Sequence, residues 1–229
     1  RAFPDRALVF RSLDPEANGP ILSALTELGY RAVFARRVYY VRPDDPALFR
    51  HRDLRHDLRL ERGSPYCSRP PSEAECDRIV RLYSMLYLEK YSTWNPAFTA
   101  DFVRLCLREE LLHLRVLTRN GQPDAVWGCF ERNGVMTQPL FGYDTGLPVE
   151  SGLYRLLSLQ VLQEGRRRGV LVNQSAGAGR FKRTRGGRSV PEYAAVYDRH
   201  LPLGRRLPWS LVQWLSERVG RPLIEKHEL

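Results

Sequence analysis

A basic, glycine-rich segment toward the C-terminal end has the residue types best suited to chemistry. Residues 175–187 read SAGAGRFKRTRGG, and five of the nine positions from Arg180 to Arg188 are Lys or Arg. Glycine lets a backbone approach a ligand closely, and clustered cations bind phosphates. The segment follows an apolar run at 170–173, and α/β ligand sites usually lie at such strand ends. The pattern favours an anion-binding element; a solvated basic turn is the alternative.

The segment 144–152, DTGLPVESG, directly precedes a long helical pattern, and the N-terminus of a helix can bind a phosphate. A phosphate-binding turn presents backbone N–H groups to a pyrophosphate at a helix N-terminus. Here Asp144 and Glu150 add negative charge, and Pro148 removes one N–H donor. The segment therefore argues against a nucleotide pyrophosphate in this position. Asp144 is also a candidate general base, although an Asp before Thr-Gly often only forms a turn.

Three consecutive arginines end the helix expected at 153–168. Cations suit the C-terminal end of a helix dipole, so a structural role competes with phosphate binding there. The candidate phosphate-binding residues are Arg180, Arg183, Arg185, Arg188, Arg166, Arg167 and Arg168.

The elements that must position these residues are clearest between residues 112 and 173. Strand patterns at 112–119, 125–132 and 135–143 are separated by Asn120-Gly121 and Asn133-Gly134. Asn-Gly pairs supply the positive φ angles of tight hairpin turns, so an antiparallel meander is expected. A helix at 153–168, ended by Gly169, then leads to a strand at 170–173. A crossover of this kind places the new strand parallel to the third meander strand.

The remaining elements are less regular. Residues 1–60 read as a partial α/β unit, and a soft boundary separates it from the region 72–229. Ser72 and Glu75 match a capping box that begins a helix. The other expected elements are a strand at 7–10, a helix at 20–28, a short hairpin from 31–34 and 38–41, an irregular connection at 42–71, helices at 72–90 and 100–110, a strand at 192–197 and a helix at 208–219. In the helix at 100–110, Phe102, Leu105 and Cys106 are expected to point inward.

A family resemblance rests on Phe181-Lys182-x-x-x-Gly186 followed by Glu192-Tyr193. This string resembles the FK…G…EY stretch of Fem-type peptidyltransferases, which are GNAT-like proteins. The element order over 72–229 is also similar to a GNAT core. The resemblance implies an α/β (α+β) GNAT fold, in which a mixed sheet contains the meander 112–143, the crossover helix 153–168 and a splayed parallel strand at 170–174. It also implies an aminoacyl-tRNA donor and places Phe181 and Lys182 near the reacting carbonyl.

The expected function is an amide-forming N-acyltransferase that moves an aminoacyl group from aminoacyl-tRNA to a small-molecule amine. An acyl-CoA enzyme with an atypical loop and a non-catalytic GNAT-fold binding module are the alternatives. The candidate catalytic residues are Lys182, Phe181 and Asp144. Fem proteins usually contain two GNAT-like halves, and 229 residues are too few for two. The acceptor is therefore open.

The amino-acid composition limits the partners, cofactors and location that we expect for this protein. The net charge of +10 is compatible with a tRNA partner, and also with the arginine usage of a GC-rich genome. Cys67, Cys76, Cys106 and Cys129 are scattered, with no CxxC or HExxH pattern, so neither a metal site nor a cofactor other than the acyl donor is expected. No run approaches the roughly 18 apolar residues of a membrane span, so we expect a cytoplasmic protein without a membrane partner. The sequence gives no oligomeric state.

Overall fold

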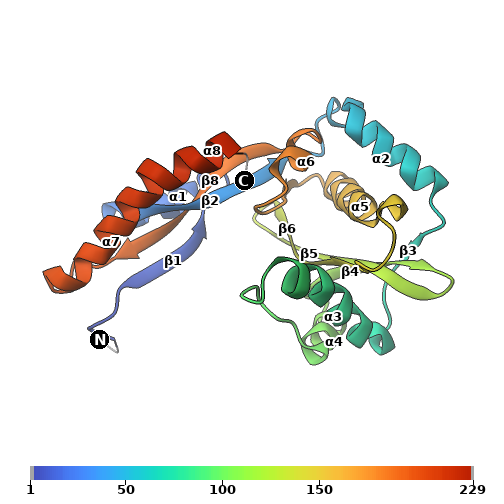
Figure 1. The fold of residues 1–229 in the computed structure, drawn as a ribbon, viewed down its shortest axis with the longest axis horizontal. Helices are drawn as coiled ribbons and strands as arrows, with labels where there is room; N and C mark the ends of the chain where they lie inside the picture. The colour runs from blue at the N-terminus through green and yellow to red at the C-terminus, as the bar shows by residue number, and fades with distance from the viewer. Residues whose placement is uncertain (1–2, 228–229) are drawn as a thin grey trace. The chain divides into compact units, whose positions relative to one another are not determined.

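In the computed structural model, which describes residues 3–227, the chain divides into two units (Figure 1). The central unit is continuous in sequence and comprises residues 41–173. The terminal unit combines residues 1–40 with residues 174–229. The divisions fall at 40/41 and 173/174, so the region 72–229 contributes to both units. Among residues 3–227, no helix combines the length and apolar character needed to cross a bilayer.

The central unit is built on a mixed sheet with strand order β7-β6-β5-β4-β3. Its strands are β3 Cys67–Arg69, β4 His113–Arg119, β5 Gln122–Arg132, β6 Val135–Tyr143 and β7 Leu171–Asn173. The expected meander is confirmed, with antiparallel pairing of β4 with β5 and of β5 with β6. Both tight turns have positive φ angles, at 53° and 82° for Asn120-Gly121 and at 51° and 73° for Asn133-Gly134. The parallel pairing of β6 with β7 is confirmed as well.

Helices cover both faces of this sheet, as Figure 1 shows. One face carries α3 Cys76–Ser84, which continues as the π-helical segment η3 Met85–Tyr91, and α4 Ala100–Arg108. The opposite face carries α5 Leu153–Arg168 and α2 Arg52–Gly63. The capping box of Ser72 and Glu75 is present, and Gly169 ends α5 at a φ of 68°. The crossover helix therefore has the predicted bounds.

Two expectations for the first half of the chain are wrong. The region 42–71 is not irregular, because it contains the 3-10 turn η1 Leu48–Arg50, α2 and β3. Its five prolines lie outside α2, whose few leucines pack on the core. The expected hairpin from 31–34 and 38–41 is one strand, β2 Arg31–Val41, with a register shift between Phe34 and Arg36. The polar residues between its halves mark this irregularity, since the chain there has no turn-forming residue.

Two expectations for individual helices also need correction. In α4, Phe102 and Leu105 are 39% and 47% exposed, whereas Val103 and Cys106 are buried. The final helix begins before Pro208, as α7 Leu203–Leu215. It continues beyond Gly220, through the π-helical segment η5 Ser216–Gly220 into α8 Arg221–His227. Continued helical hydrogen bonding therefore overrides the stop signal of Gly220-Arg221-Pro222.

The terminal unit is a three-stranded antiparallel arrangement with β8 Arg188–Tyr197 between β1 Leu8–Leu13 and β2. The helix α1 Gly19–Glu27 packs on it through a small core of Leu13, Leu25 and Ala195. The short helix α6 Gly179–Arg183 lies inside the basic segment and precedes β8. Both ends of the chain are therefore needed to build this unit.

The end of β6 lies unusually close to the helical segment on one face of the central sheet. A Cβ atom on Gly142 would come within 2.6 Å of the backbone C and O atoms of Leu82 and of the backbone N of Tyr83. Backbone atoms of a helix cannot move aside as a flexible side chain does. Glycine at position 142 is therefore required for α3 to pack on β6.

We predict that Gly142→Ala destabilises the protein by about 1–3 kcal/mol, the usual range for overpacking a core. Urea unfolding followed by circular dichroism measures this change. The matched control is Gly63→Ala at the end of α2, where an added Cβ meets nothing within 4 Å. This control should be neutral or slightly stabilising. Equal stability of Gly142→Ala and wild type would contradict the packing argument.

Candidate active site

The strand β6 contains a bulge at the point where it separates from β7. β6 and β7 are paired from Val135↔Leu171 to Thr137↔Asn173, and β6 then continues to Tyr143. On its other side, the β5 register passes from Gly128↔Leu140 to Phe130↔Thr137. Two β6 residues therefore oppose one β5 residue, which is the arrangement of a β-bulge. The β6 backbone beyond Thr137 is left without a strand on its β7 side among the described residues.

The bulge also changes which side chains face α5. Met136 and Phe141 both belong to the core cluster around α5, although an odd separation puts residues on opposite faces of a regular strand. Leu140 belongs to the cluster around α3 and α4. Cys129, the β5 residue opposite the bulge, is buried on the α5 side. The bulged residues Gln138 and Pro139 therefore lie opposite an α5-facing position.

Gln138 is the polar side chain at this bulge. Its Oε1 atom is buried and has no hydrogen-bond partner within residues 3–227. Pro139 follows it and has no N–H to offer. A buried amide oxygen without a donor is unusual in a folded protein, and an ordered water or a ligand can supply the missing hydrogen bond. This residue was not among the sequence-predicted site residues; a proline inside a central strand was the signal that could have located the bulge.

The loop between β6 and α5 uses its own backbone N–H groups internally. Asp144 accepts a hydrogen bond from the Gly146 N–H at 3.0 Å, and the Leu147 N–H bonds to the Asp144 carbonyl at 3.3 Å. The Ser151 and Gly152 N–H groups bond to the carbonyls of Pro148 and Val149, each at 3.0 Å. These four N–H groups are therefore not arranged as an open cradle for phosphate.

Asp144 also forms an ion pair with Arg78 of α3, at 2.8 Å between Oδ2 and Nη2. Burial alone would raise the pKa of Asp144, but the hydrogen bonds from Arg78 and Gly146 outweigh it and lower that pKa. A carboxylate with a lowered pKa is a weaker proton acceptor. The structure therefore places the predicted general base in a contact that reduces its basicity. Arg78 was not identified from the sequence.

Lys182 lies in α6 and is buried in the terminal unit. Its Nζ donates hydrogen bonds to the carbonyls of Gln174, Ser175 and Ala176 at 2.6, 3.1 and 2.8 Å. An ammonium group has three N–H donors, so these carbonyls occupy all of them. Burial is the main cause that lowers the pKa of Lys182 to about 7, and the positive charge of Arg36 contributes to this lowering. The lysine thus binds the chain that leads into the glycine-rich segment.

The aromatic neighbour of Lys182 is covered by an arginine. The guanidinium carbon of Arg185 lies 3.6 Å from the centre of the Phe181 ring, and Arg185 Nη1 bonds to the Phe181 carbonyl at 3.1 Å. Arg185 is itself buried. Arg183 donates a hydrogen bond to the Tyr39 hydroxyl at 3.1 Å. The contacts of these two arginines are therefore made within the protein and help to hold the basic segment in place.

Arg180 and Arg188 differ from them because both are exposed. Arg188 forms an ion pair with Glu16, and Arg180 has none among the described residues. Of the four arginines predicted from this segment, these two present their charge most directly to solvent. They are therefore the residues of the segment best placed to contact a polyanion.

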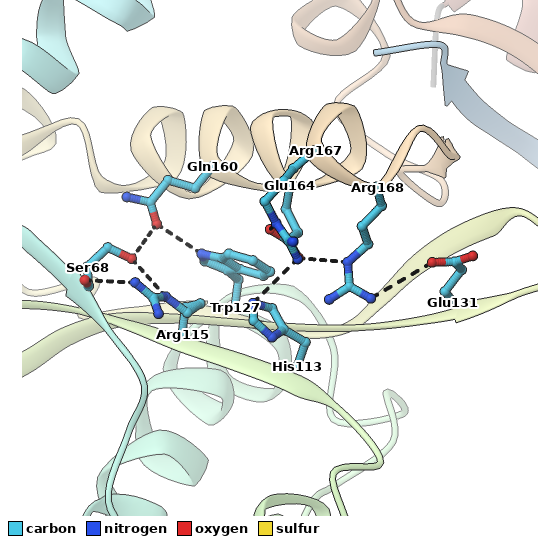
Figure 2. Close-up of polar contacts among 9 residues, drawn as sticks. All are labelled: Ser68, His113, Arg115, Trp127, Glu131, Gln160, Glu164, Arg167 and Arg168. Carbon is cyan, nitrogen blue, oxygen red and sulfur yellow. Dashed lines mark hydrogen bonds and ion pairs between the residues drawn. The ribbon is translucent and has the colours of Figure 1, made fainter. Parts of the chain in front are cut away.

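Arg167 and Arg168 at the end of α5 belong to a polar network in the central unit (Figure 2). Glu164 accepts hydrogen bonds from Arg167 and Arg168 at 2.6 and 2.7 Å, and its Oε1 lies 3.6 Å from His113 Nε2. The hydrogen bond from Arg167 is the largest cause that lowers the pKa of Glu164, to about 2. Arg166 instead stacks on Phe49, 5.0 Å from the ring centre. A structural role therefore explains most of the contacts made by these three arginines.

Comparisons with known proteins agree with this fold. Residues 48–183 match the family model described as an acetyltransferase (GNAT) domain. A chain described as the C-terminal domain of a lysylphosphatidylglycerol synthetase from Agrobacterium fabrum has a TM-score of 0.62 and 16% identity, over 90% of this chain and 72% of that chain. L-PGS from Bacillus licheniformis also has a TM-score of 0.62 and 16% identity, over 86% of this chain and 69% of that chain.

FemX is a further solved structure with a TM-score of 0.62, at 9% identity, over 90% of this chain and 74% of that chain. No curated protein matches the sequence. The matched family model spans more than half of the chain, and it includes the β6 bulge, the separation of β6 from β7 and the helix α6. The chain therefore belongs to the acetyltransferase (GNAT) domain family and is an acyltransferase.

Proposed function

We propose that this acyltransferase takes its acyl group from aminoacyl-tRNA and transfers it to the amine of a small-molecule acceptor. The resemblance of the Phe181-Lys182 segment to Fem-type proteins supports this donor. The fold shared with FemX and with two lysylphosphatidylglycerol synthetases is consistent with it. The second of these names describes a lysyl group joined to phosphatidylglycerol, which is also an aminoacyl product.

The loop at 144–152 is the observation that carries the proposal. Its acidic residue Asp144 occupies the Gly146 N–H, and three further loop N–H groups bond within the loop. A pyrophosphate in this position would meet a carboxylate and few available donors. An acyl-CoA donor therefore lacks its usual binding element, whereas an aminoacyl ester of tRNA does not need one here.

The proposed reaction uses an ester that is already activated, so it needs little covalent chemistry from the protein. The acceptor nitrogen attacks the ester carbonyl carbon, a C–N bond forms, and the bond from carbon to the ribose oxygen breaks. The proton lost by the amine is transferred to the ribose oxygen that leaves. Holding ester and amine in reactive geometry supplies about 7–11 kcal/mol of the barrier reduction.

In this proposal, Phe181 and Lys182 support the reacting carbonyl, as the resemblance implies. Lys182 could do so in two ways, because its three donors already bond to the carbonyls of residues 174–176. The ammonium either exchanges one of these bonds for the developing oxyanion or acts by fixing the segment that carries Phe181. Since Arg78 weakens Asp144 as a base, we assign proton transfer to a group of the substrate.

An acyl-CoA donor is the second candidate, and one observation favours it. The helix α5 begins at Leu153 after Gly152 without a side-chain cap, so its first N–H groups could receive an anion. The two donors are expected to give different results in a transfer assay.

The donor is tested by supplying the purified protein with radiolabelled aminoacyl-tRNA or acetyl-CoA and a panel of primary amines. We expect transfer only from aminoacyl-tRNA, and complete loss of transfer after RNase treatment. Full activity with acetyl-CoA alone, or activity that survives RNase, would contradict the proposed donor. Deacylated tRNA serves as the blank.

A second prediction concerns the exposed arginines. Affinity for tRNA should fall steeply with salt, with a slope of roughly −0.7 to −0.9 in log K against log salt for each phosphate neutralised. The double variant Arg180→Ala/Arg188→Ala should flatten this slope by about one to two units. Filter binding between about 50 and 200 mM salt measures it.

The matched control for this double variant is Arg62→Ala/Arg132→Ala, which removes two exposed arginines of the central unit. It should leave the slope unchanged. Stability should also be nearly unchanged in both double variants, because exposed ion pairs contribute little. A salt-independent affinity of the wild type would rule out binding of an RNA backbone by these residues.

A third prediction concerns Lys182. Lys182→Met should lower turnover by about 10²–10³, the scale for losing one donor to an oxyanion. Lys90→Met, at an exposed position of η3, is the control and should behave as wild type. Wild-type turnover of Lys182→Met would refute the role. If affinity for tRNA falls as much as turnover does, Lys182 acts by fixing the segment rather than at the carbonyl.

The charge of Lys182 gives this prediction a pH signature. Because its pKa is lowered to about 7, the ammonium is present below that pH and is lost as the pH rises through it. With donor saturating, the wild-type rate should therefore lose the Lys182 contribution above pH 7. Lys182→Met should lack this descending limb.

A further inference from the structure

The side-chain oxygen of Gln138 makes no hydrogen bond within residues 3–227. The residue lies in the β6 bulge, directly after the last pair between β6 and β7, and its Oε1 is buried without a donor. The polar side chains of the network in Figure 2, by contrast, all have partners. A buried amide oxygen therefore remains available at the bulge.

The position of this oxygen limits what it could bind. The β6 backbone next to it has no strand on its β7 side beyond Thr137 in the described part of the chain, and backbone N–H groups on such an edge suit a carbonyl oxygen. An amide oxygen accepts hydrogen bonds, so its partner must carry an N–H or O–H group. A simple acyl group such as acetyl has no such donor. An aminoacyl group does, because its α-amino nitrogen is bonded to the carbon next to the ester carbonyl.

We propose that the side-chain oxygen of Gln138 accepts a hydrogen bond from the α-amino group of the aminoacyl donor. The inference rests on the proposed aminoacyl-tRNA donor and adds a specificity determinant to it. The α-amino group of the donor satisfies Gln138. A donor without this group leaves the buried oxygen unpaired, so the site discriminates against simple acyl groups.

The same oxygen could in principle serve the amine of the acceptor, and the two cases are separable. Binding of the donor alone involves no acceptor. A preference for the α-amino group that is measured in donor binding therefore reports on the donor. A contribution of Gln138 that appears only when acceptor is present reports on the acceptor.

The test uses one tRNA acylated with pairs of groups that differ only in the α-amino group. The pairs are alanine with propionate, and lysine with 6-aminohexanoate. For the wild type, we expect about tenfold tighter binding of the aminoacylated member of at least one pair, as for a hydrogen bond that involves a charged group. In Gln138→Leu and Gln138→Met, this ratio should fall to within about twofold of unity.

Gln122→Leu, at the exposed start of β5, removes an amide from the same unit and should leave the ratio unchanged. Thermal unfolding checks the variants: because the oxygen is unpaired without ligand, Gln138→Met should be as stable as the wild type or more so. A wild type that binds both members of each pair equally would overturn the inference, as would a preference that survives Gln138→Leu. In either case tRNA binding would leave the proposed donor class intact. If no acylated tRNA binds, both the proposed donor and the inference about Gln138 are contradicted.

Discussion

The bulge at Gln138–Pro139 is the constraint on which the rest of the central unit depends. One additional residue in β6 moves its following side chains to the opposite faces, so Phe141 faces α5 and Gly142 faces α3. The bulge begins directly after the last β6–β7 pair, Thr137↔Asn173, which is also where β7 ends. The separation from β7 and the change in which side chains face each helix therefore occur at one point of β6.

Arginine supplies most of the positive charge, yet much of it is used within the protein. Arg78 pairs with Asp144, Arg155 with the buried Asp57, and Arg167 and Arg168 with Glu164. Guanidinium groups suit this use because they bond to carboxylates in a bidentate manner and are weakly hydrated. Net charge is therefore a poor guide to a nucleic-acid surface here. The arginines relevant to nucleic-acid binding are the exposed ones, and in the terminal unit these include Arg180 and Arg188.

The fold could be predicted from the sequence wherever local chemistry determines it. Asn120-Gly121, Asn133-Gly134 and Gly169 define the meander and the end of α5, because their positive φ angles are local properties. The missed elements depend on distant partners: α2 is charged and is held by leucines that contact α5. The site was less predictable, because the bonds from Lys182 to three carbonyls and the isolation of Gln138 arise only in the folded chain.

The terminal unit has a consequence for biosynthesis, because β8 lies between two strands that precede it by more than a hundred residues. During synthesis on a ribosome, β1 and β2 emerge first and cannot pair with β8 until β8 has been synthesised. The central unit is continuous in sequence, so it can fold while β8 is still unsynthesised. Contacts of such long range are slow to form, since the intervening chain must first be closed into a loop. The order of the segments along the chain therefore favours folding of the central unit before the terminal unit.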